Sequence, residues 1–264
     1  MPKTTVSHIR EYWENQAKQH QTSHVASWGD HWAIDLEIEA IAKHIRAGQT
    51  VLDVGCANGY STFRQYEKQP GATFTGVDYA DTMIHYARQT KQEKGVGKAI
   101  EFQTGDILAL PFDDRRFDVT YTTRVLINLP TWEQQQQGIA ECLRVTKPGG
   151  MVVLSEGFWE PLCLLNSMRQ LLGLSPPLAE HDFNRYLKKQ KLESWLNERR
   201  IAWSADEFSS LYYLGSRVLR EVMLDTLPPY GDYNSPVNEL FFNIEKQYSG
   251  GGFGIQQAYV LTKP

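Results

Sequence analysis

Apolar side chains follow two different periods along the first 157 residues. Residues 36–45 place them three and four positions apart, as in an amphipathic helix, and the short apolar run at 49–55 that follows predicts a strand. The same alternation predicts further strands at 73–80, 99–110, 117–123 and 151–157, and further helices at 60–69, 81–95 and 133–146. Such an alternation, with connections of crossover length, predicts a doubly wound, mostly parallel sheet with helices on both faces.

The alternation stops after residue 157. Residues 158–192 are helical in pattern, rich in aromatic side chains and interrupted by Pro176 and Pro177, which predicts a helical lid inserted after the fifth strand. Beyond a crossover helix, the pattern predicts a sixth strand at 207–213, helices at 215–227 and 239–247, and a final strand at 254–263. The expected fold is therefore α/β, with a seven-stranded sheet.

Composition narrows the class of protein. The 264 residues include 27 Lys and Arg against 31 Asp and Glu, a formal net charge of -4, so a general basic field for nucleic acid is not expected. No signal peptide or membrane-spanning helix is expected, because the N-terminus and the rest of the chain lack apolar runs of the length each needs. The three cysteines are scattered without a CxxC pair, which predicts reduced thiols in a cytoplasmic protein and no metal site.

The first strand runs directly into a glycine-rich turn, VLDVGCANGY, at residues 51–60. Gly55 permits a sharp turn and Gly59 lets a ligand lie against the backbone, as at the carboxyl edge of an open α/β sheet. A dinucleotide fingerprint matches only at Gly55, and Tyr60 occupies a position that needs a small residue. Because Asp53 would repel a pyrophosphate and attract an amino group, the turn favours a cationic, adenosine-containing ligand.

This stretch resembles the first motif of the class I S-adenosylmethionine-dependent methyltransferases, with Ala57 in place of the middle glycine. The other motifs of that family follow in order: GVDYAD with Asp78, TGDILALPF with Asp106, then FDVTYTTRVLINLP and LRVTKPGGMVVLSE. An acidic side chain at Asp78 is suited to accept hydrogen bonds from both ribose hydroxyls. The resemblance covers residues 49–156.

The resemblance implies a Rossmann-like methyltransferase fold, S-adenosylmethionine as cofactor and no metal. It divides the chain into an N-terminal helical cap or flap at 1–48, a cofactor-binding core at 49–157, the helical lid at 158–192 and the rest of the core sheet at 193–264. The residues expected to bind the cofactor are Tyr12, Trp28, Asp53, Gly55, Ala57, Gly59, Asp78, Tyr79, Met83, Gly105, Asp106, Ile107 and Thr123.

Each of these positions also has a purely structural interpretation. The glycines can simply close the turn, and Asp106 can be an ordinary turn residue. Asp81 is expected to cap the helix at 81–95, which leaves Asp78 free for a ligand. Tyr12 either covers the cofactor or docks its helix on the core, whereas Trp28 lies beside a flexible glycine and suits a closing flap.

The acceptor side is expected to involve Arg124, Asn128, Trp159, Phe183 and Tyr186. Arg124 departs from the family, which has an apolar or aromatic residue there. It suits a carboxylate, phosphate or sulfate, or else an ion pair with Asp30 or Asp106. The aromatic residues suit an apolar or ring-bearing acceptor, or else pack the lid on the sheet.

Asn128 stands where the family has a histidine, and an amide cannot take a proton. The candidates for a base are then His31, Glu156 and His181, unless no base is used. A carboxylate acceptor needs none, because it is already ionised.

The expected function is O-methylation of a carboxylate or hydroxyl group on a small molecule, with no nucleic-acid or membrane partner, by a monomer or a homodimer. The alternatives are an NAD-dependent oxidoreductase, a non-catalytic S-adenosylmethionine-binding protein and a nucleic-acid methyltransferase. The last lacks both the basic field and an N/D-P-P-Y/F motif after the fourth strand.

Overall fold

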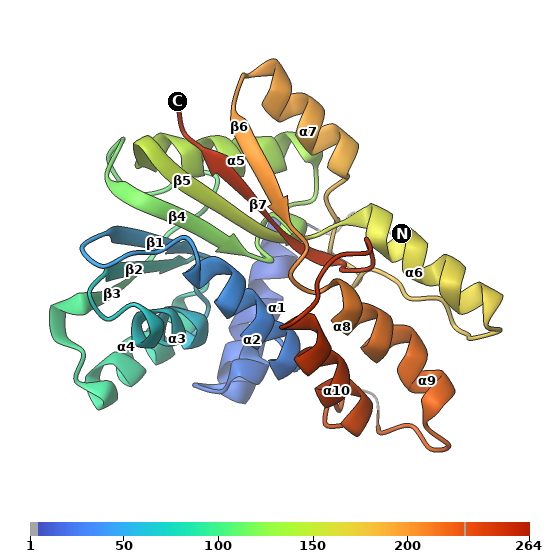
Figure 1. Cartoon of the computed structure of the whole chain (residues 1–264). Coiled ribbons are helices and arrows are strands. Elements are labelled where there is room, and N and C mark those ends of the chain that lie inside the picture. Colours follow the sequence, from blue (N-terminus) through green and yellow to red (C-terminus); the bar gives the residue numbers. More distant parts are fainter. Residues whose placement is uncertain (1–4, 230) are drawn as a thin grey trace.

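The computed structural model describes residues 5–229 and 231–264 and contains a single seven-stranded sheet (Figure 1). The strand order is β3-β2-β1-β4-β5-β7-β6, and β7 is antiparallel to both of its neighbours. The strands are β1 Thr50–Val54, β2 Thr73–Asp78, β3 Ile100–Thr104, β4 Phe117–Thr123, β5 Thr146–Gly157, β6 Ala202–Asp206 and β7 Gln256–Thr262. The predicted mostly parallel α/β fold is confirmed.

Helices cover both faces of this sheet. The longer ones are α1 Val6–His20, α2 His31–Ala42, α3 Tyr60–Lys68, α4 Asp81–Lys94, α5 Trp132–Val145, α6 Trp159–Leu171, α7 Lys189–Glu198 and α10 Pro236–Glu245. Strand β1 is buried on both sides, since Val51 belongs to the core cluster that includes α2 and α3, whereas Leu52 belongs to the one that includes α5 and α7. This two-sided burial is why the first strand is a continuous apolar run.

The sixth strand lies earlier than its predicted position at 207–213. The structure places β6 at Ala202–Asp206, where it pairs with β7, and makes Ser210–Leu214 the short helix α8. Tyr212 and Tyr213 on α8 are buried in the core, and a short apolar run of this kind does not distinguish a strand from a buried helix. The third strand is also shorter than predicted, ending at Thr104.

The segments beyond β5 are arranged differently from the predicted lid. In 158–192, α6 is followed by a non-helical stretch at 172–188, which returns to the end of β5, where Leu187 N donates to Gly157 O at 2.9 Å. Between β6 and β7 lies a helical insertion, 207–255, which includes α8, a π-helical turn at Gly215–Leu219, α9 Arg220–Met223 and α10. The sequence had assigned it to the core sheet, but in Figure 1 it lies beside α6, beyond the end of the parallel strands.

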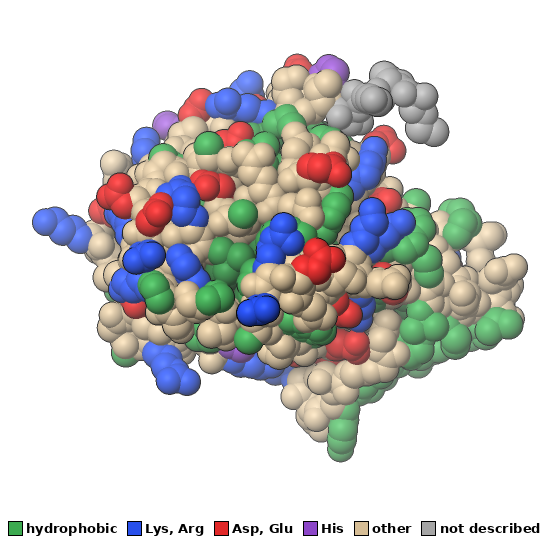
Figure 2. Space-filling model, turned by 90° about the horizontal axis from the view of Figure 1, so that it is seen from above, with side chains coloured by type: hydrophobic (Ala, Val, Ile, Leu, Met, Phe, Trp, Pro, Cys, Tyr) green, Lys and Arg blue, Asp and Glu red, His purple; other side chains and the backbone are tan. Residues whose placement is uncertain are grey.

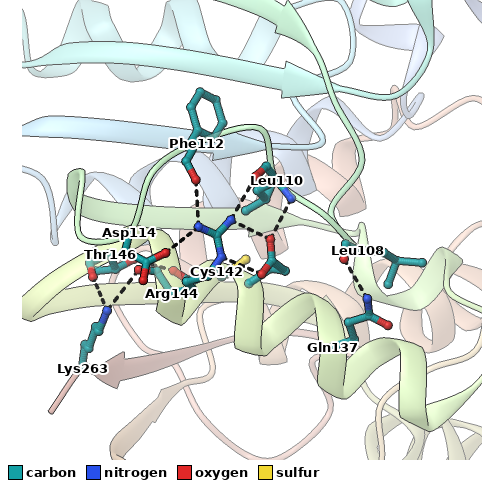
Figure 3. A network of polar contacts seen from close by, with 10 residues as sticks. Leu108, Leu110, Phe112, Asp114, Gln137, Cys142, Arg144, Thr146 and Lys263 are labelled. Carbon is teal, nitrogen blue, oxygen red and sulfur yellow. Dashed lines mark hydrogen bonds and ion pairs between the residues drawn. The ribbon is translucent and has the colours of Figure 1, made fainter.

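A polar network holds the connection between β3 and β4 against α5 (Figure 3). Arg144 donates to the backbone oxygens of Leu110 and Phe112 at 2.9 and 2.8 Å and pairs with Asp114 at 2.8 Å. Gln137, two turns earlier on α5, donates to Leu108 O at 2.8 Å. The loop that follows Asp106 is therefore fixed by side chains of α5.

The outer surface carries both signs of charge. Lys and Arg side chains are interspersed with Asp and Glu on the face shown in Figure 2, while hydrophobic side chains gather at the side from which α6 and α9 project. Among the described residues, no helix is long and apolar enough to cross a membrane.

Candidate functional site

A cavity of about 960 Å³ opens where the loops after β1, β2, β4 and β5 meet. Its walls also include α1, the non-helical stretch 172–188 and the insertion between β6 and β7. The predicted site residues that line it are Tyr12, Trp28, Gly55, Ala57, Asp78, Met83, Thr123, Arg124, Asn128, His181, Phe183 and Tyr186.

The remaining predicted residues are not among the described residues that line the cavity: Asp53, Gly59, Tyr79, Gly105, Asp106, Ile107, Trp159, His31 and Glu156. Several are engaged elsewhere. Ile107 is buried in the core cluster under α5, and Trp159 lies on the outside of α6 beneath the ammonium of Lys188. Asp106 is exposed and accepts from Leu108 N at 2.9 Å, as a turn residue does.

The glycine-rich turn needs its glycines for packing within the protein. Gly55 and Gly59 have φ of +76° and +81°. A Cβ on Gly55 would lie 2.0 Å from Val125, and one on Gly59 would lie 2.7 Å from Phe102. Gly55 also lines the cavity, whereas Gly59 is packed against the core rather than against the space for a ligand.

Asp78, at the end of β2, joins two loops of the cavity wall. Its Oδ2 accepts from Ala57 N at 3.0 Å and its Oδ1 from Ala80 N at 2.9 Å. Burial raises the pKa of Asp78 to about 6, against these two hydrogen bonds, which lower it. Asp78 therefore supports the turn after β1 and still presents a carboxylate edge to the cavity.

The cap of α4 differs from the prediction. Ala80 is the N-cap residue rather than Asp81, and the N–H groups of Asp81 and Thr82 donate to the carboxylate of Glu14 on α1 at 2.7 and 3.0 Å. Asp81 instead pairs with Arg10 of α1 at 2.9 Å. The two contacts attach α1 across the entrance of the cavity, and neither partner on α1 was visible from local sequence.

Asp53 lies behind the turn rather than in the cavity. It is completely buried and accepts from Thr62 Oγ1 at 2.6 Å. Burial raises the pKa of Asp53 from 3.8 to about 7, opposed by the hydroxyls of Thr62 and Tyr121. The carboxylate thus joins β1 to α3, and the structure does not bring it to the surface where a ligand would bind.

Residues 21–30 form a flap over the glycine-rich turn, and Ser27 and Trp28 of this flap line the cavity. Asn58, in the glycine-rich turn, donates to the backbone oxygens of Gln21 and Ser23 at 2.8 and 2.7 Å. The guanidinium of Arg124 stacks on Trp28 of this flap, and its Cζ lies 4.5 Å from the centroid of the Trp28 ring. Trp28 was expected to line the site as part of a flap, and it does line the cavity. Asn58 was not among the expected site residues, yet it is 2% exposed and fixes the flap to the turn.

Arg124 forms an ion pair, but with a different partner from those expected. It has a φ of +57° and its Nη2 lies 3.6 Å from Oε2 of Glu37, a fully buried residue of α2. Burial raises the pKa of Glu37, and the charge of Arg124 opposes that rise. Asp30, one of the expected partners, pairs with Arg217 at 2.5 Å instead.

Glu156, a candidate base, is occupied by the loop after β4. It accepts from Thr122 Oγ1 at 2.7 Å and from the N–H groups of Val125, Leu126 and Ile127 at 3.1 to 3.3 Å. Burial raises its pKa to about 7, and these hydrogen bonds lower it. Glu156 therefore shapes the loop that carries Arg124.

Aromatic side chains close the cavity between α1 and the stretch 172–188. Phe183 contacts Tyr12 with ring centroids 4.9 Å apart and Trp13 at 6.1 Å. His181, another candidate base, lies in the same cluster, 4.4 Å from Phe183 and 5.6 Å from Tyr12. We call Tyr12, Trp13, His181 and Phe183 the aromatic gate.

Replacing Asp53 by Asn tests its buried position. Because its folded pKa is raised, the folded state holds the proton more tightly than the unfolded state between about pH 4 and pH 7. The free energy of unfolding therefore falls as pH rises through this window, by at most about 1.4 kcal/mol per pH unit for one group. In Asp53→Asn this contribution disappears. The free energy of unfolding, measured with urea at pH 5, 6, 7 and 8, therefore falls less steeply with pH than in the unaltered protein.

Asp113→Asn, at an exposed position, is the matched control and keeps the decline of the unaltered chain. Equal slopes in Asp53→Asn and the unaltered protein would contradict a raised pKa at this carboxyl.

Comparisons with known proteins agree with this geometry. Residues 51–150 match the family model described as a methyltransferase domain. The chain is 35% identical over 123 residues to sterol 24-C-methyltransferase from Pneumocystis carinii (strain B80), covering 43% of this chain and 31% of that protein. It is 30% identical over 151 residues to ubiquinone biosynthesis O-methyltransferase from Pseudomonas fluorescens (strain Pf0-1), covering 56% and 62%. It thus spans less than two thirds of either relative's length.

Solved structures resemble the whole chain in fold. A chain from the complex that contains the Haloferax volcanii Trm112 methyltransferase activator gives a TM-score of 0.60 at 17% identity over 98% of both chains. Geranyl diphosphate C-methyltransferase from Streptomyces coelicolor A3(2) gives 0.56 at 13% identity over 87% of this chain and 79% of that one. Residues 51–150 are thus similar in sequence to a methyltransferase domain, and the chain has the fold of the solved methyltransferase structures to which it is similar.

Proposed function

We propose that this protein transfers the methyl group of S-adenosylmethionine to an oxygen atom, of a carboxylate or a hydroxyl group, on a small acceptor molecule. The observation that carries the proposal is a single cavity that combines the glycine-rich turn and Asp78 with a second wall from outside the matched domain. Both relatives are named for methyl transfer, one to carbon and one to oxygen.

In this proposal the cofactor lies on the wall formed by Gly55, Ala57, Asp78 and Met83. The free edge of the Asp78 carboxylate accepts hydrogen bonds from the ribose hydroxyls, and Met83 contacts the adenine. The ring of Trp28 covers the cofactor and helps to exclude water. The aromatic faces there also tolerate a positive sulfonium.

The chemistry is an in-line displacement at a carbon that the positive sulfur already activates. The protein has to align the acceptor oxygen, the methyl group and the sulfur, and such alignment contributes roughly 7–11 kcal/mol to lowering the barrier. Of the three candidate bases, Glu156 is engaged by the loop after β4 and His31 is outside the cavity lining. His181 lines the cavity, with its ring packed against Phe183 and Tyr12. This favours an acceptor oxygen that is already ionised, such as a carboxylate.

Ligand-dependent thermal unfolding tests the cofactor. S-adenosylhomocysteine and S-adenosylmethionine at about 100 times their Kd each stabilise the protein by roughly 2.7 kcal/mol, and NAD has no effect. In Asp78→Asn the stabilisation by both sulfur ligands is reduced, because one acceptor for the ribose hydroxyls becomes a donor. The exposed control Asp113→Asn responds as the unaltered chain does.

Stabilisation by NAD alone would favour the oxidoreductase alternative. Binding without turnover of any acceptor would favour a non-catalytic binding protein.

The aromatic gate leads to a prediction about ligand release. Phe183→Ala removes the two ring contacts of Phe183 with α1, to Tyr12 and Trp13, each worth about 0.5–1.5 kcal/mol. S-adenosylhomocysteine therefore dissociates roughly 2- to 12-fold faster from the variant for each of these contacts that opening must break. Stopped-flow displacement measures the rate. Tyr248→Ala, at a surface position 69% exposed, serves as control and leaves it unchanged. An unaltered rate in Phe183→Ala would mean that the ligand leaves by another route.

A further inference from the structure

One part of the cavity wall outside the matched domain is a helical stripe. Tyr213, Ser216, Arg217, Arg220 and Glu221 occupy positions i, i+3, i+4, i+7 and i+8, which is the spacing of one helix face, and all of them line the cavity. The stripe runs through the π-helical turn at 215–219, a distortion that is common at functional sites. No motif of the methyltransferase domain reaches these residues, which lie outside 51–150.

The cavity contains four arginines, and three of them have a carboxylate partner. The pairs are Arg124 with Glu37 at 3.6 Å, Arg169 with Glu221 at 2.6 Å, and Arg217 with Asp30 at 2.5 Å. Each of these cations is compensated within the protein. They hold the walls together, because separating a largely buried pair would leave one charge without its partner.

Arg220 is different. Across residues 5–229 and 231–264, no carboxylate lies within ion-pair distance of its guanidinium. Its one hydrogen bond, from Nη1 to the backbone oxygen of Asp232, is long at 3.4 Å, and its Nε is buried without a partner. The side chain of Asp232 is engaged with Asn234 N at 2.8 Å. A half-buried guanidinium without a carboxylate partner is costly, and an anion from a ligand would lower that cost.

We infer that Arg220 binds an acidic group, a carboxylate or a phosphate, on the methyl acceptor. The inference rests on the proposed function for the identity of the ligand as an acceptor. Leu227 and Pro228 line the cavity close in sequence to Arg220, and aromatic residues line the wall across from it. The ligand that fits is an amphipathic acid, with an apolar or ring-bearing body and one anionic group on the side of α9.

Arg220 is a better anion site than Arg124 for two reasons. Arg124 is already paired with the buried Glu37 and stacked on Trp28. A fork of guanidinium N–H groups beside the cavity, as at Arg220, matches carboxylate and phosphate oxygens.

Calorimetric titration of the full chain with three matched probes tests the inference. The probes are 3-phenylpropanoate, its neutral isostere 3-phenylpropanamide, and 2-phenylethyl phosphate, each with and without saturating S-adenosylhomocysteine. The unaltered protein binds one or both acids at least tenfold more tightly than the amide, since a charge-assisted pair is stronger than a neutral hydrogen bond. The two acids distinguish a carboxylate site from a phosphate site.

In Arg220→Met the preference for the acids over the amide is lost, and S-adenosylhomocysteine binds as before. Arg220→Lys retains part of the preference, because the charge remains without the fork. Arg46→Met, at an exposed position that does not line the cavity, keeps the full preference for the acids over the amide. A general loss of structure would weaken the amide and the acids equally, so the ratio of affinities isolates the charge.

The inference is overturned if the unaltered protein binds neither acid better than the amide, or if Arg220→Met keeps the preference. Loss of the preference in Arg124→Met would then assign it to Arg124. Failure of S-adenosylhomocysteine to bind would overturn the proposed function instead. The probe titrations without that ligand still measure whether Arg220 binds an acid.

Discussion

A parallel sheet ends in loops whose backbone N–H groups have no neighbouring strand to bond. In this protein, carboxylates supply the missing acceptors at the carboxyl edge, and two of them, Asp78 and Glu156, are buried. Asp78 accepts from the loops after β1 and β2, Glu156 from the loop after β4, and Glu14 from the start of α4. Because buried N–H groups without acceptors are costly, the position of each loop follows the position of its carboxylate. The cavity exists in its observed shape because these acceptors fix its edges.

The part of the structure that depends on local pattern could be predicted from the sequence. Apolar runs of strand length, punctuated by glycine and separated by amphipathic helices, place β1 to β5 and the helices between them. The turn after β1 is recognisable because Gly55 needs a positive φ and a close approach to Val125. Asp78 follows from its place at the end of the second strand. These inferences use information that lies within a few residues of each position.

The errors all concern partners that are distant in sequence. Asp81 is a good capping residue by type, yet Glu14 of α1 caps α4 because the helix packs across its N-terminus. Arg124 pairs with Glu37, 87 positions earlier in the numbering, rather than with Asp30 or Asp106. The run at 207–213 has the apolar content of a strand, but tertiary packing makes part of it helix α8. Local propensity is a weak guide wherever a long-range contact satisfies the same groups better.

The two walls of the cavity consequently differ in origin. The wall with the glycine-rich turn comes from consecutive units of the sheet, whereas the opposite wall is assembled from α1, the stretch 172–188 and the insertion between β6 and β7. Three of the four cavity arginines are paired with carboxylates, and Glu180, Asp182 and Asp232 also line this wall, so no broad positive field remains to attract anions in general. In a chain with net charge -4, one uncompensated guanidinium therefore has a local effect only: it acts on a ligand already inside the cavity. Such an arrangement selects an acid by position and geometry, through the group at Arg220, rather than by long-range attraction.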